Sequence, residues 1–505
     1  MGTVEIDGSR LTLEDAVAVS RGTLQVKLSK EARENMQLSK SAVDTIIDSG
    51  KVVYGINTGF GAMSSVTIDK AELEDLQVNL VRSHACGVGK RMEPEHVLLM
   101  ILLRANSLAK GVSGTRPEVV DLMLSMINFR IAPVVPRIGS LGASGDLAPL
   151  SHMALSMIGE GECSVYGKSG WMNISSIEAL AKNGLKPLKL EAKEGLSLIN
   201  GTSQMSAYLA LSVLNMESLV MAADFAVACS LESVRGLHAP FDSRIHQVRP
   251  HIGQNISAAR IKELLSNSSV ATLPSSRVQD AYCFRCSPQV HGPVIEIIEN
   301  TRKMLEIEIN SATDNPLVFV NDEDVEIISG GNFHGENLGL ASDYLAMACH
   351  ELGSISERRI NKIMNPKLTG LGAFLANNEG LESGLMIVHY VAAALISELQ
   401  LLSNSTTTYN VPVSLDKEDH VSMGATGAYR TLKSTTLLSQ VLANELICSS
   451  EALDRISESP GAGVQKIHSW IRKFVNPMHL DRTMTSDCEK IASLLIDGDH
   501  TSIFR

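Results

Sequence analysis

Apolar residues recur at helical spacing along most of the second half of the chain. The pattern predicts five long helices, over residues 204–235, 288–309, 338–364, 384–402 and 422–453. Helices of this length indicate an extended bundle. Their apolar stripes are broad and rich in small residues, which indicates burial on more than one side and therefore a homo-oligomer.

The segment 338–364 shows such a stripe clearly. Its apolar positions fall on one predicted helix face, made of Leu340, Tyr344, Met347, Ala348, Leu352 and Ile355. The positions that stay polar are Glu357, Arg358, Arg359 and Lys362. We expect the apolar stripe to be buried, with the polar positions outside it.

The first part of the chain combines short elements with glycine-rich turns at 55–61, 87–89 and 139–145. Glycine permits left-handed backbone and close approach of chain segments, and loops of this kind often build functional sites. The sequence therefore predicts a mainly α-helical protein of two domains. Residues 1–199 form a loop-rich N-terminal domain that carries the Tyr54, His84 and Ala143-Ser144-Gly145 motifs. Residues 200–505 form a long-helix bundle with a C-terminal helical region.

Composition and charge narrow the class of function. The 505 residues carry a formal net charge of −12 and no Lys/Arg-rich run, which argues against a nucleic-acid partner. The N-terminus lacks the pattern of a signal peptide, and the longest strongly apolar stretch, 385–396, is too short to cross a bilayer. The eight cysteines are scattered, so no disulfide framework is expected. These features predict a cytoplasmic protein with no membrane partner.

The histidines and cysteines give no strong indication of a metal site. His350-Glu351 lacks the second histidine of a zinc-binding helix, because residue 354 is Ser. Cys283 and Cys286 form a lone C-x-x-C without a second pair. His152 is expected to be structural.

The segment 139–152, with the sequence GSLGASGDLAPLSH, carries the most informative pattern. As local structure it is a glycine-rich turn leading into a helix, with Ser144 or Asp146 as the N-cap. It fits a hydrolase G-x-S-x-G motif poorly because residue 146 is Asp. It fits a phosphate-binding loop poorly because no Lys follows the glycines.

A third interpretation of this segment involves backbone chemistry. Attack of the Gly145 amide nitrogen on the carbonyl carbon of Ala143 would close a five-membered ring. Loss of water there and from the Ser144 side chain would leave a methylidene-imidazolone. Small residues let the backbone fold onto itself, and serine supplies the hydroxyl that leaves. The product is an electrophile that needs no added cofactor.

The segment resembles the signature of the aromatic amino acid ammonia-lyases and aminomutases. Seven further segments resemble the same family in the same order: YGINTGFG (54–61), QVNLVRSHACGVG (77–89), GLSLINGTS (195–203), VQDAYCFRCSPQVHG (278–292), NSATDNP (310–316), SGGNFHGE (329–336) and EDHVSM (418–423). The resemblance therefore covers essentially the whole chain.

Within this family the histidine branch is the most similar. Ser83-His84 resembles the pair that this branch carries where phenylalanine-specific members usually have Phe-Leu, although tyrosine-specific members can also carry His. Glu418 stands where the tyrosine and phenylalanine branches usually have Gln. A carboxylate there can accept a charge-assisted hydrogen bond from an imidazole N–H. The resemblance implies elimination of ammonia from L-histidine to give trans-urocanate, a step of histidine catabolism.

The resemblance also implies roles for individual residues. Tyr54 would remove the β-proton, which requires activation by its neighbours because a free phenol has a pKa of about 10. Arg285 would bind the substrate carboxylate in a two-pronged hydrogen bond. The remaining positions would orient the electrophile or the substrate: His84, Asn200, Gln279, Tyr282, Phe333 and Glu418. By the same resemblance the enzyme is a homotetramer whose active sites combine loops from three chains. Taken singly, each residue also has a structural interpretation, such as a packed core tyrosine or phenylalanine.

One stretch departs from the histidine branch. Over 399–417, Leu399 and Lys417 replace residues that the branch usually has, and Lys417 places a cation beside Glu418. Several functions therefore stay open: deamination of tyrosine or phenylalanine, 2,3-amino migration, a lyase for a modified histidine, or a degenerate relative that acts as a scaffold. The intact Ala143-Ser144-Gly145, Tyr54 and Arg285 argue against the scaffold.

Overall fold

The computed structural model describes residues 2–59, 66–273, 277–321 and 324–504. The chain folds into two compact units. Unit 1 comprises Met1–Leu211, Arg302–Ser342 and Ser405–Tyr429, and unit 2 comprises Ser212–Thr301, Asp343–Asn404 and Arg430–Arg505. This division differs from the predicted domains 1–199 and 200–505, because two later segments return to unit 1. Such a return depends on packing between distant segments, which local periodicity does not report.

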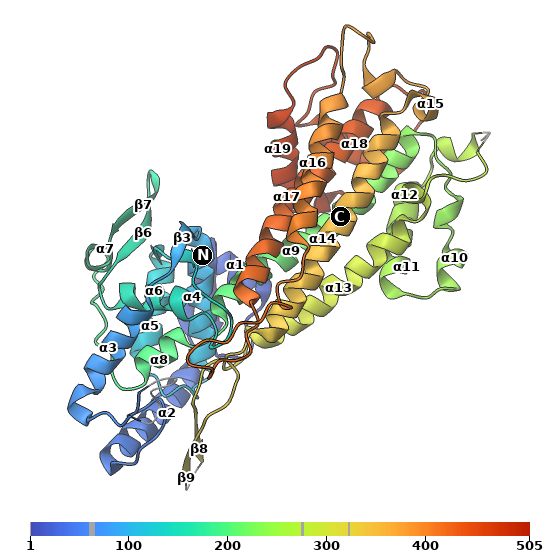
Figure 1. Cartoon of the computed structure of the whole chain (residues 1–505). Helices are drawn as coiled ribbons and strands as arrows, with labels where there is room; N and C mark the ends of the chain where they lie inside the picture. Colours follow the sequence, from blue (N-terminus) through green and yellow to red (C-terminus); the bar gives the residue numbers. More distant parts are fainter. Residues whose placement is uncertain (1, 60–65, 274–276, 322–323, 505) are drawn as a thin grey trace. The chain divides into compact units, whose positions relative to one another are not determined.

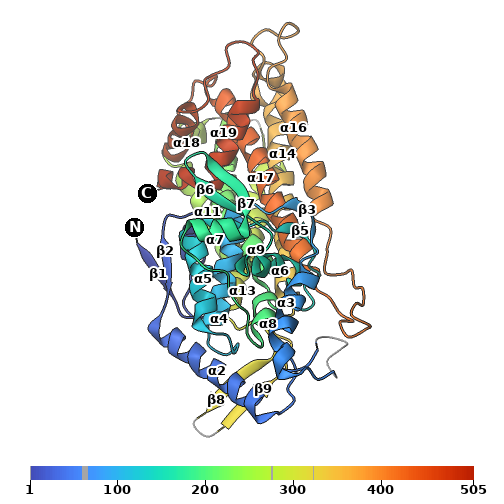
Figure 2. The ribbon, with the colours of Figure 1, turned by 90° about the vertical axis from the view of Figure 1, so that its left-hand side faces the viewer.

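Unit 1 is built from helices around a buried central helix (Figure 2). Helix α4 (Pro94–Ala109) is buried continuously from Val97 to its last residue, and α5 (Pro117–Asn128) packs beside it. The other helices of unit 1 are α1 (Leu13–Ser20), α2 (Lys30–Ser49), η2 (Lys70–Glu72), α3 (Leu73–His84), α6 (Leu147–Met157), α7 (Ser176–Lys182) and α8 (Glu194–Ile199). Such short elements leave room for the loops between them to meet.

The strands of unit 1 form small separate sheets. They are a parallel pair of β1 (Thr3–Ile6) and β2 (Gln25–Leu28), an antiparallel pair of β3 (Val88–Arg91) and β5 (Pro136–Ile138), a three-stranded sheet in the order β4 (Ile131–Pro133), β6 (Glu162–Gly167), β7 (Gly170–Ser175), and a hairpin of β8 (Leu317–Asn321) and β9 (Asp324–Ile328). Val318 of β8 packs into a buried cluster with Val43 and Ile46 of α2 and with Ile56. This packing anchors the turn that precedes β8.

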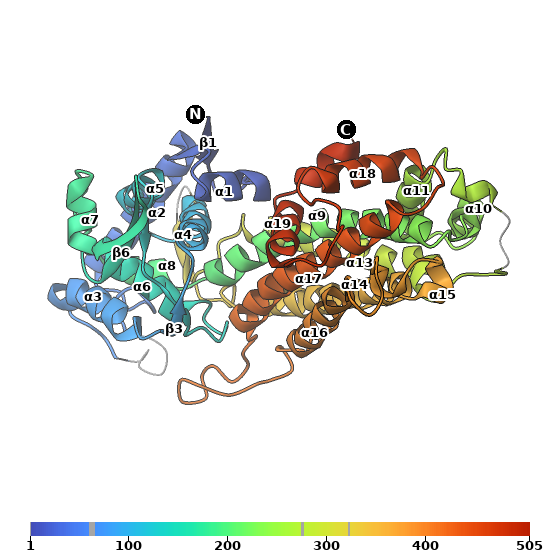
Figure 3. The same ribbon diagram turned by 90° about the horizontal axis from the view of Figure 1, so that it is seen from above.

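Unit 2 is a bundle of long helices that run side by side (Figures 1 and 3). The predicted long helices are confirmed as α9 (Ser203–Ser233), α13 (Ser287–Glu308), α14 (Glu336–Ile363), α16 (Met386–Leu402) and α17 (Gly424–Leu453). Shorter helices complete the unit: η3 (Ala239–Phe241), α10 (Ser243–Gln247), α11 (Ile252–Leu264), η4 (Val270–Thr272), α12 (Tyr282–Arg285), α15 (Pro366–Thr369), η5 (Ala373–Leu375), α18 (Ala462–Arg472), α19 (Thr485–Ile496) and η6 (Asp499–Phe504). The mainly α-helical class is also confirmed.

Helix α14 buries a charged side chain and, in a single copy of the chain, exposes part of its apolar stripe. Its apolar residues Tyr344 and Met347 are exposed, whereas Arg359, expected among the outer polar positions, is fully buried. The guanidinium of Arg359 forms an ion pair with Glu445 of α17, with 2.8 Å between Nη2 and Oε2. The prediction for Arg359 was wrong because a satisfied charge pair can occupy a core position, which hydrophobic periodicity does not reveal.

A second apolar segment, helix α9, is longer than the stretch 385–396. By length and composition it passes the test for a membrane-spanning helix, but 78% of the apolar window is buried inside the protein. That burial is the environment of a core helix.

Candidate active site

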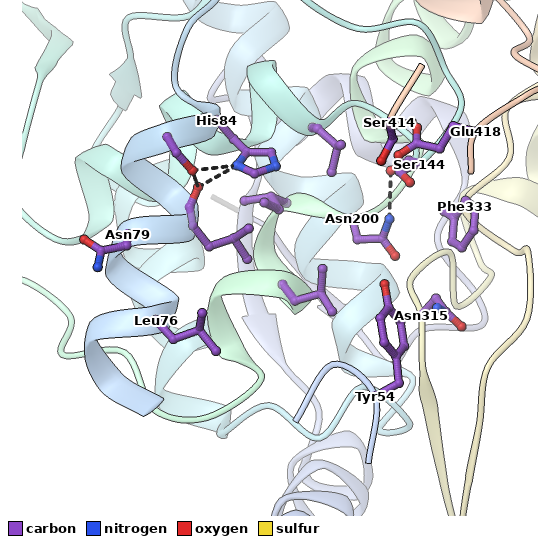
Figure 4. A pocket seen from close by; sticks show the side chains of 15 residues that line it. Tyr54, Leu76, Asn79, His84, Ser144, Asn200, Asn315, Phe333, Ser414 and Glu418 are labelled. Carbon is purple, nitrogen blue, oxygen red and sulfur yellow. Dashed lines mark hydrogen bonds between the residues drawn. The ribbon is translucent and has the colours of Figure 1, made fainter. Parts of the chain in front are cut away.

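A cavity of about 480 Å³ opens in unit 1, at the end of α8 (Figure 4). Its lining includes Tyr54, Ser144, Asn200, Phe333 and Glu418, which come from five separate stretches of the chain. The other lining residues are Leu76, Asn79, Leu80, Ser83, His84, Leu147, Leu196, Ile199, Asn315 and Ser414. The fold thus gathers most of the residues that the motifs indicated.

The Ala143-Ser144-Gly145 segment is held where α6 begins. The backbone of Gly145 adopts a φ of +71°, and a Cβ there would collide with the carbonyl oxygen of Gly201. The amide of Asp146 donates to the same oxygen at 2.7 Å. Only glycine fits this close backbone approach. On the other side, the hydroxyl of Ser422 donates to the carbonyl oxygen of Gly142 at 2.9 Å.

Asp146 has a different function from the one that local structure suggested. It occupies the N-cap position of α6 but makes no side-chain cap hydrogen bond there. Its carboxylate accepts hydrogen bonds from the amides of Gln204 and Met205, at 2.8 and 3.1 Å, in the first turn of α9. Burial raises the pKa of Asp146 to about 6, against the opposing effect of its hydrogen bond from Ser140 and those two amides. Asp146 therefore ties the tripeptide loop to α9.

Asn200 contacts the tripeptide directly. Its side-chain nitrogen donates to the carbonyl oxygen of Ser144 at 2.8 Å (Figure 4). Its Oδ1 is buried and has no hydrogen-bond partner among the described residues. A buried acceptor without a partner is costly, so this oxygen is suited to accept from a ligand in the cavity.

Tyr54 is placed by the glycine that follows it. Gly55 has a φ of +74°, and a Cβ there would lie 2.8 Å from Cδ of Pro316 and 3.0 Å from Cδ2 of Leu196. The loop therefore rests closely on α8 and on the turn before β8. In Figure 4 the hydroxyl of Tyr54 points toward the side chain of Asn200. The last two residues of the YGINTGFG motif lie outside the described residues.

His84 and Glu418 line the cavity from two other elements. His84 lies at the end of α3, and its Nδ1 is 2.9 Å from the carbonyl oxygen of Leu80. Glu418 lies in a short antiparallel bridge with Val413, so the residues between them form a tight turn. Ser414, in that turn, has a φ of +55° and also faces the cavity. The cavity wall thus offers a carboxylate and an imidazole among apolar side chains.

Comparison with known proteins fits this geometry. The model of the aromatic amino acid lyase family matches residues 11–473. The chain belongs to this family. It is 45% identical to the histidine ammonia-lyase of Caldanaerobacter subterraneus over 99% of this chain and 97% of that protein.

Solved structures of the family extend the comparison. The crystal structure of histidine ammonia-lyase from Trypanosoma cruzi has a TM-score of 0.92 and 38% identity, and the match covers 99% of this chain and 94% of that one. Tyrosine aminomutase from Streptomyces globisporus has the same TM-score with 34% identity, covering 99% and 98%. The backbone alone therefore does not separate the branches of the aromatic amino acid lyase family.

Three residues that the family resemblance singled out lie in unit 2. Gln279 and Tyr282 are exposed, and Arg285 is half-buried. The guanidinium of Arg285 lies over the ring of Tyr282, 4.5 Å from its centroid, and its Nε donates to the carbonyl oxygen of Asp280 at 3.1 Å. None of the three is among the residues that line the cavity.

Some lining residues were not assigned a role from the sequence. Asn315 belongs to the NSATDNP motif, which was the signal available for it. Its Oδ1 accepts a hydrogen bond from the amide of Gly330 at 2.6 Å, which joins both ends of the β8–β9 hairpin. Asn79 and His84 both belong to the QVNLVRSHACGVG motif on α3, whereas only the three-dimensional structure indicates that Leu76 is part of the wall. Lys417, in contrast, is exposed and outside the lining.

The remaining histidine and cysteine predictions concern positions outside the cavity lining. His152 accepts a hydrogen bond from the amide of Gly87 at 3.1 Å, so it has a structural partner. In the part of the chain that the structure describes, no group of three or more His, Cys, Asp or Glu side chains is arranged to hold a metal ion. The eight cysteines are free thiols, and burial raises the pKa of Cys283 in the lone C-x-x-C.

Proposed function

We propose that this protein is a carbon–nitrogen lyase that eliminates ammonia from L-histidine to give trans-urocanate. The observation that carries the proposal is the cavity in which Tyr54, Ser144 and Asn200 meet Glu418 and His84. A base, a candidate electrophile and imidazole-binding groups thus share one cavity. The full-length similarity to histidine ammonia-lyases supports the same substrate.

We propose that Ala143-Ser144-Gly145 cyclises to a methylidene-imidazolone. The residues present fit such a group: the backbone at Gly145 admits no side chain, and Asn200 already holds the carbonyl of Ser144. When formed, the group supplies an electrophilic alkene to the substrate. Asn200 Nδ2 would keep the ring oriented, and its unpartnered Oδ1 would accept a hydrogen bond from the substrate's amine.

Tyr54 is the proposed base for the β-proton. Its loop packs at Gly55 against Leu196 and Pro316, which fixes the backbone beside Tyr54, and Tyr54 lines the cavity. A held phenol is useful because proton transfer requires hydrogen-bond distance in the reactive complex. The imidazole of the substrate would lie between His84 and Glu418, where the carboxylate accepts from a ring N–H.

We expect the substrate carboxylate to pair with a cation. The described residues contribute no Lys or Arg to the lining. We propose a homotetramer in which Gln279, Tyr282 and Arg285 of other copies complete each site. Exposed apolar residues on α14 and α16, such as Tyr344, Met347 and Tyr390, support association of copies through the bundle. A cytoplasmic location also stays a prediction, supported by eight free thiols.

A substrate panel tests the proposal. The purified protein is incubated separately with L-histidine, L-tyrosine, L-phenylalanine and a modified histidine, and the ultraviolet absorbance of each unsaturated product is followed. We expect histidine to have the highest kcat/KM, and intact mass to show loss of two waters from the chain. A preference for tyrosine, or a β-amino acid product, would assign the protein to another branch. An unmodified mass together with no turnover would favour a scaffold.

A further inference from the structure

A cluster of three charged side chains is buried behind the cavity. Lys193, Arg104 and Asp314 are each fully buried. The ammonium of Lys193 lies 3.4 Å from Oδ2 of Asp314, and the guanidinium of Arg104 lies 3.9 Å from Oδ1. Among the described residues, Asp314 is the one carboxylate that forms an ion pair with either cation. Two buried cations therefore share one anion.

Lys193 also has an unusual backbone. Its φ is +70°, in the left-handed region that glycine or asparagine normally occupies. The side chain nevertheless has well-defined partners: Nζ donates to the carbonyl oxygen of Ser113 at 2.8 Å and to the hydroxyl of Ser197 at 3.1 Å. Burial lowers the pKa of Lys193, which adds to the cost of placing a lysine there. Strain and desolvation combined at one residue are typical of positions with a function.

The first element held by the cluster is α8. Nε of Arg104 donates to the carbonyl oxygen of Ser197 at 2.9 Å, and Lys193 binds the hydroxyl of the same residue. Helix α8 ends at Ile199, and its C-cap is Asn200, whose side chain donates to the carbonyl oxygen of Ser144. The guanidinium of Arg104 also lies against Gly201, where a Cβ would collide with Nη1. The cluster thus supports the two residues that meet the tripeptide.

The second element is the turn before β8. Nη1 of Arg104 donates to the hydroxyl of Thr313 at 3.3 Å, and the hydroxyl of Ser113 donates to Asp314 at 2.9 Å. Of the next two residues, Asn315 lines the cavity and Pro316 packs against Gly55 in the Tyr54 loop. One cluster therefore anchors the supports of both Tyr54 and Asn200.

We infer that Lys193, Asp314 and Arg104 are positioning residues that set the Tyr54 hydroxyl against the substrate held at Asn200 and Ser144. None of the three lines the cavity, so they act through α8 and the 313–316 turn. Their loss should slow removal of the β-proton more than it weakens substrate binding. The inference rests on the proposed function, because it assigns a geometry to that reaction.

Lys193→Met tests this inference. Methionine fills similar space without the charge, and Arg104 and Asp314 remain as a balanced pair, so no buried carboxylate is left alone. The variant is compared with wild type for kcat and KM, each normalised to the fraction of chains whose mass shows loss of two waters. The substrate is the amino acid that wild type turns over, with and without β-deuterium. We expect kcat per modified chain to fall about tenfold or more, KM to change less than about twofold, and the isotope effect on kcat to be at least as large as in wild type.

Lys110→Met is the control for the loss of a lysine that binds backbone oxygens, at an exposed position. Lys110 also binds backbone oxygens, at 3.0 Å to Asn310 and 3.3 Å to Gly8, but it does not reach α8 or Asp314. It should keep wild-type kcat. Ser113→Ala provides a milder variant in case Lys193→Met does not fold, because it removes one hydrogen bond of Asp314 and leaves all three charges. We expect Ser113→Ala also to lower kcat per modified chain, by about two- to threefold.

The outcomes separate the inference from the function on which it rests. If wild type is inactive on every amino acid of the panel, the proposed function fails. If wild type is active and neither Lys193→Met nor Ser113→Ala lowers kcat per modified chain, the inference is wrong. It is also wrong if the isotope effect shrinks, since a step other than proton removal would then have been slowed, or if Lys110→Met shows the same loss.

Discussion

The two units bury charge in different ways. In unit 2 the pair of Arg359 and Glu445 is balanced, and the serines at 230 and 356 each donate to the carboxylate at 2.6 Å. In unit 1 two cations share Asp314, and one of them lies on a strained backbone. The balanced pair joins helices α9, α14 and α17 of a bundle. The unbalanced cluster supports loops that carry the candidate chemistry. In the packed helix bundle, the buried charges are balanced against one another. In the loop-built site, a buried charged cluster holds several loop segments in place at one point.

The largest expected effect is on activity, and it follows from a change to the tripeptide in unit 1. Ser144→Ala removes the hydroxyl that has to leave, so no electrophile can form. We expect turnover to fall by on the order of 10⁴-fold or more, equivalent to at least about 5.5 kcal/mol in activation free energy, with the melting temperature nearly unchanged. Kinetics and thermal denaturation measured on the same preparation check this. An unchanged rate in this variant would refute the mechanism.

The next effect belongs to unit 2 and is on stability. Glu445→Gln leaves Arg359 buried without its anion, which should lower the free energy of unfolding by about 3–5 kcal/mol. The double variant Arg359→Met/Glu445→Leu removes both charges and should recover most of the loss. Denaturant titration of the three proteins measures both. Equal stability of the double and single variants would contradict the role of charge imbalance.

A smaller effect is expected on specificity in unit 1. Glu418→Gln replaces the proposed partner of the imidazole N–H with a neutral acceptor. We expect kcat/KM for histidine to fall by about 10- to 100-fold, corresponding to about 1.4–2.7 kcal/mol, with little change for tyrosine. The same assay with both amino acids provides the comparison. Equal losses for the two substrates would remove the specificity argument.

The smallest effect at neutral pH concerns a buried histidine of unit 2. Nε2 of His500 donates to the carbonyl oxygen of Ser218 at 3.0 Å, and burial lowers its pKa to about 4, against the opposing effects of that bond and of Asp499. In the unfolded chain the imidazole of His500 has an ordinary pKa near 6.5, so as pH falls it is protonated there before it is protonated in the folded protein. The free energy of unfolding is therefore highest above pH ~6.5 and decreases toward pH ~4.

His500→Gln keeps a donor for Ser218 and removes this titration. Wild type should lose about 2 kcal/mol more than the variant between pH 7 and pH 5. Melting temperatures across that range provide the measurement. Parallel pH curves for the two proteins would show that His500 does not contribute.

The sequence predicts the bundle better than it predicts the return of distant segments to unit 1. The periodicity of apolar residues alone predicts long helices such as α9 and α17. Their predicted bounds agree with the observed ones to within two residues. Whether a stripe is buried depends on neighbours, which is why Tyr344 is exposed and Arg359 buried. The return of 302–342 and 405–429 to unit 1 leaves no mark in local patterning.

The sequence predicts those residues of the candidate site that belong to recognisable motifs. Tyr54, His84, Ser144, Asn200, Phe333 and Glu418 were indicated by resemblance, and one cavity brings them together. Asp314 belongs to the NSATDNP motif, whereas Lys193 lies outside the quoted motifs, and no local pattern indicates that the two side chains meet across 121 residues. Gln279, Tyr282 and Arg285 lie outside the cavity lining, so their predicted role depends on an assembly.

The tie between Gly142 and Ser422 has a consequence for the order of events in biosynthesis. The two residues are 280 positions apart, so the tripeptide leaves the ribosome long before its partner segment exists. If ring closure requires the seated loop, a chain truncated ahead of Ser422 should keep its full mass, and the modification would mark only molecules that have finished folding. The enzyme would then be inert during translation and become reactive only as a complete protein.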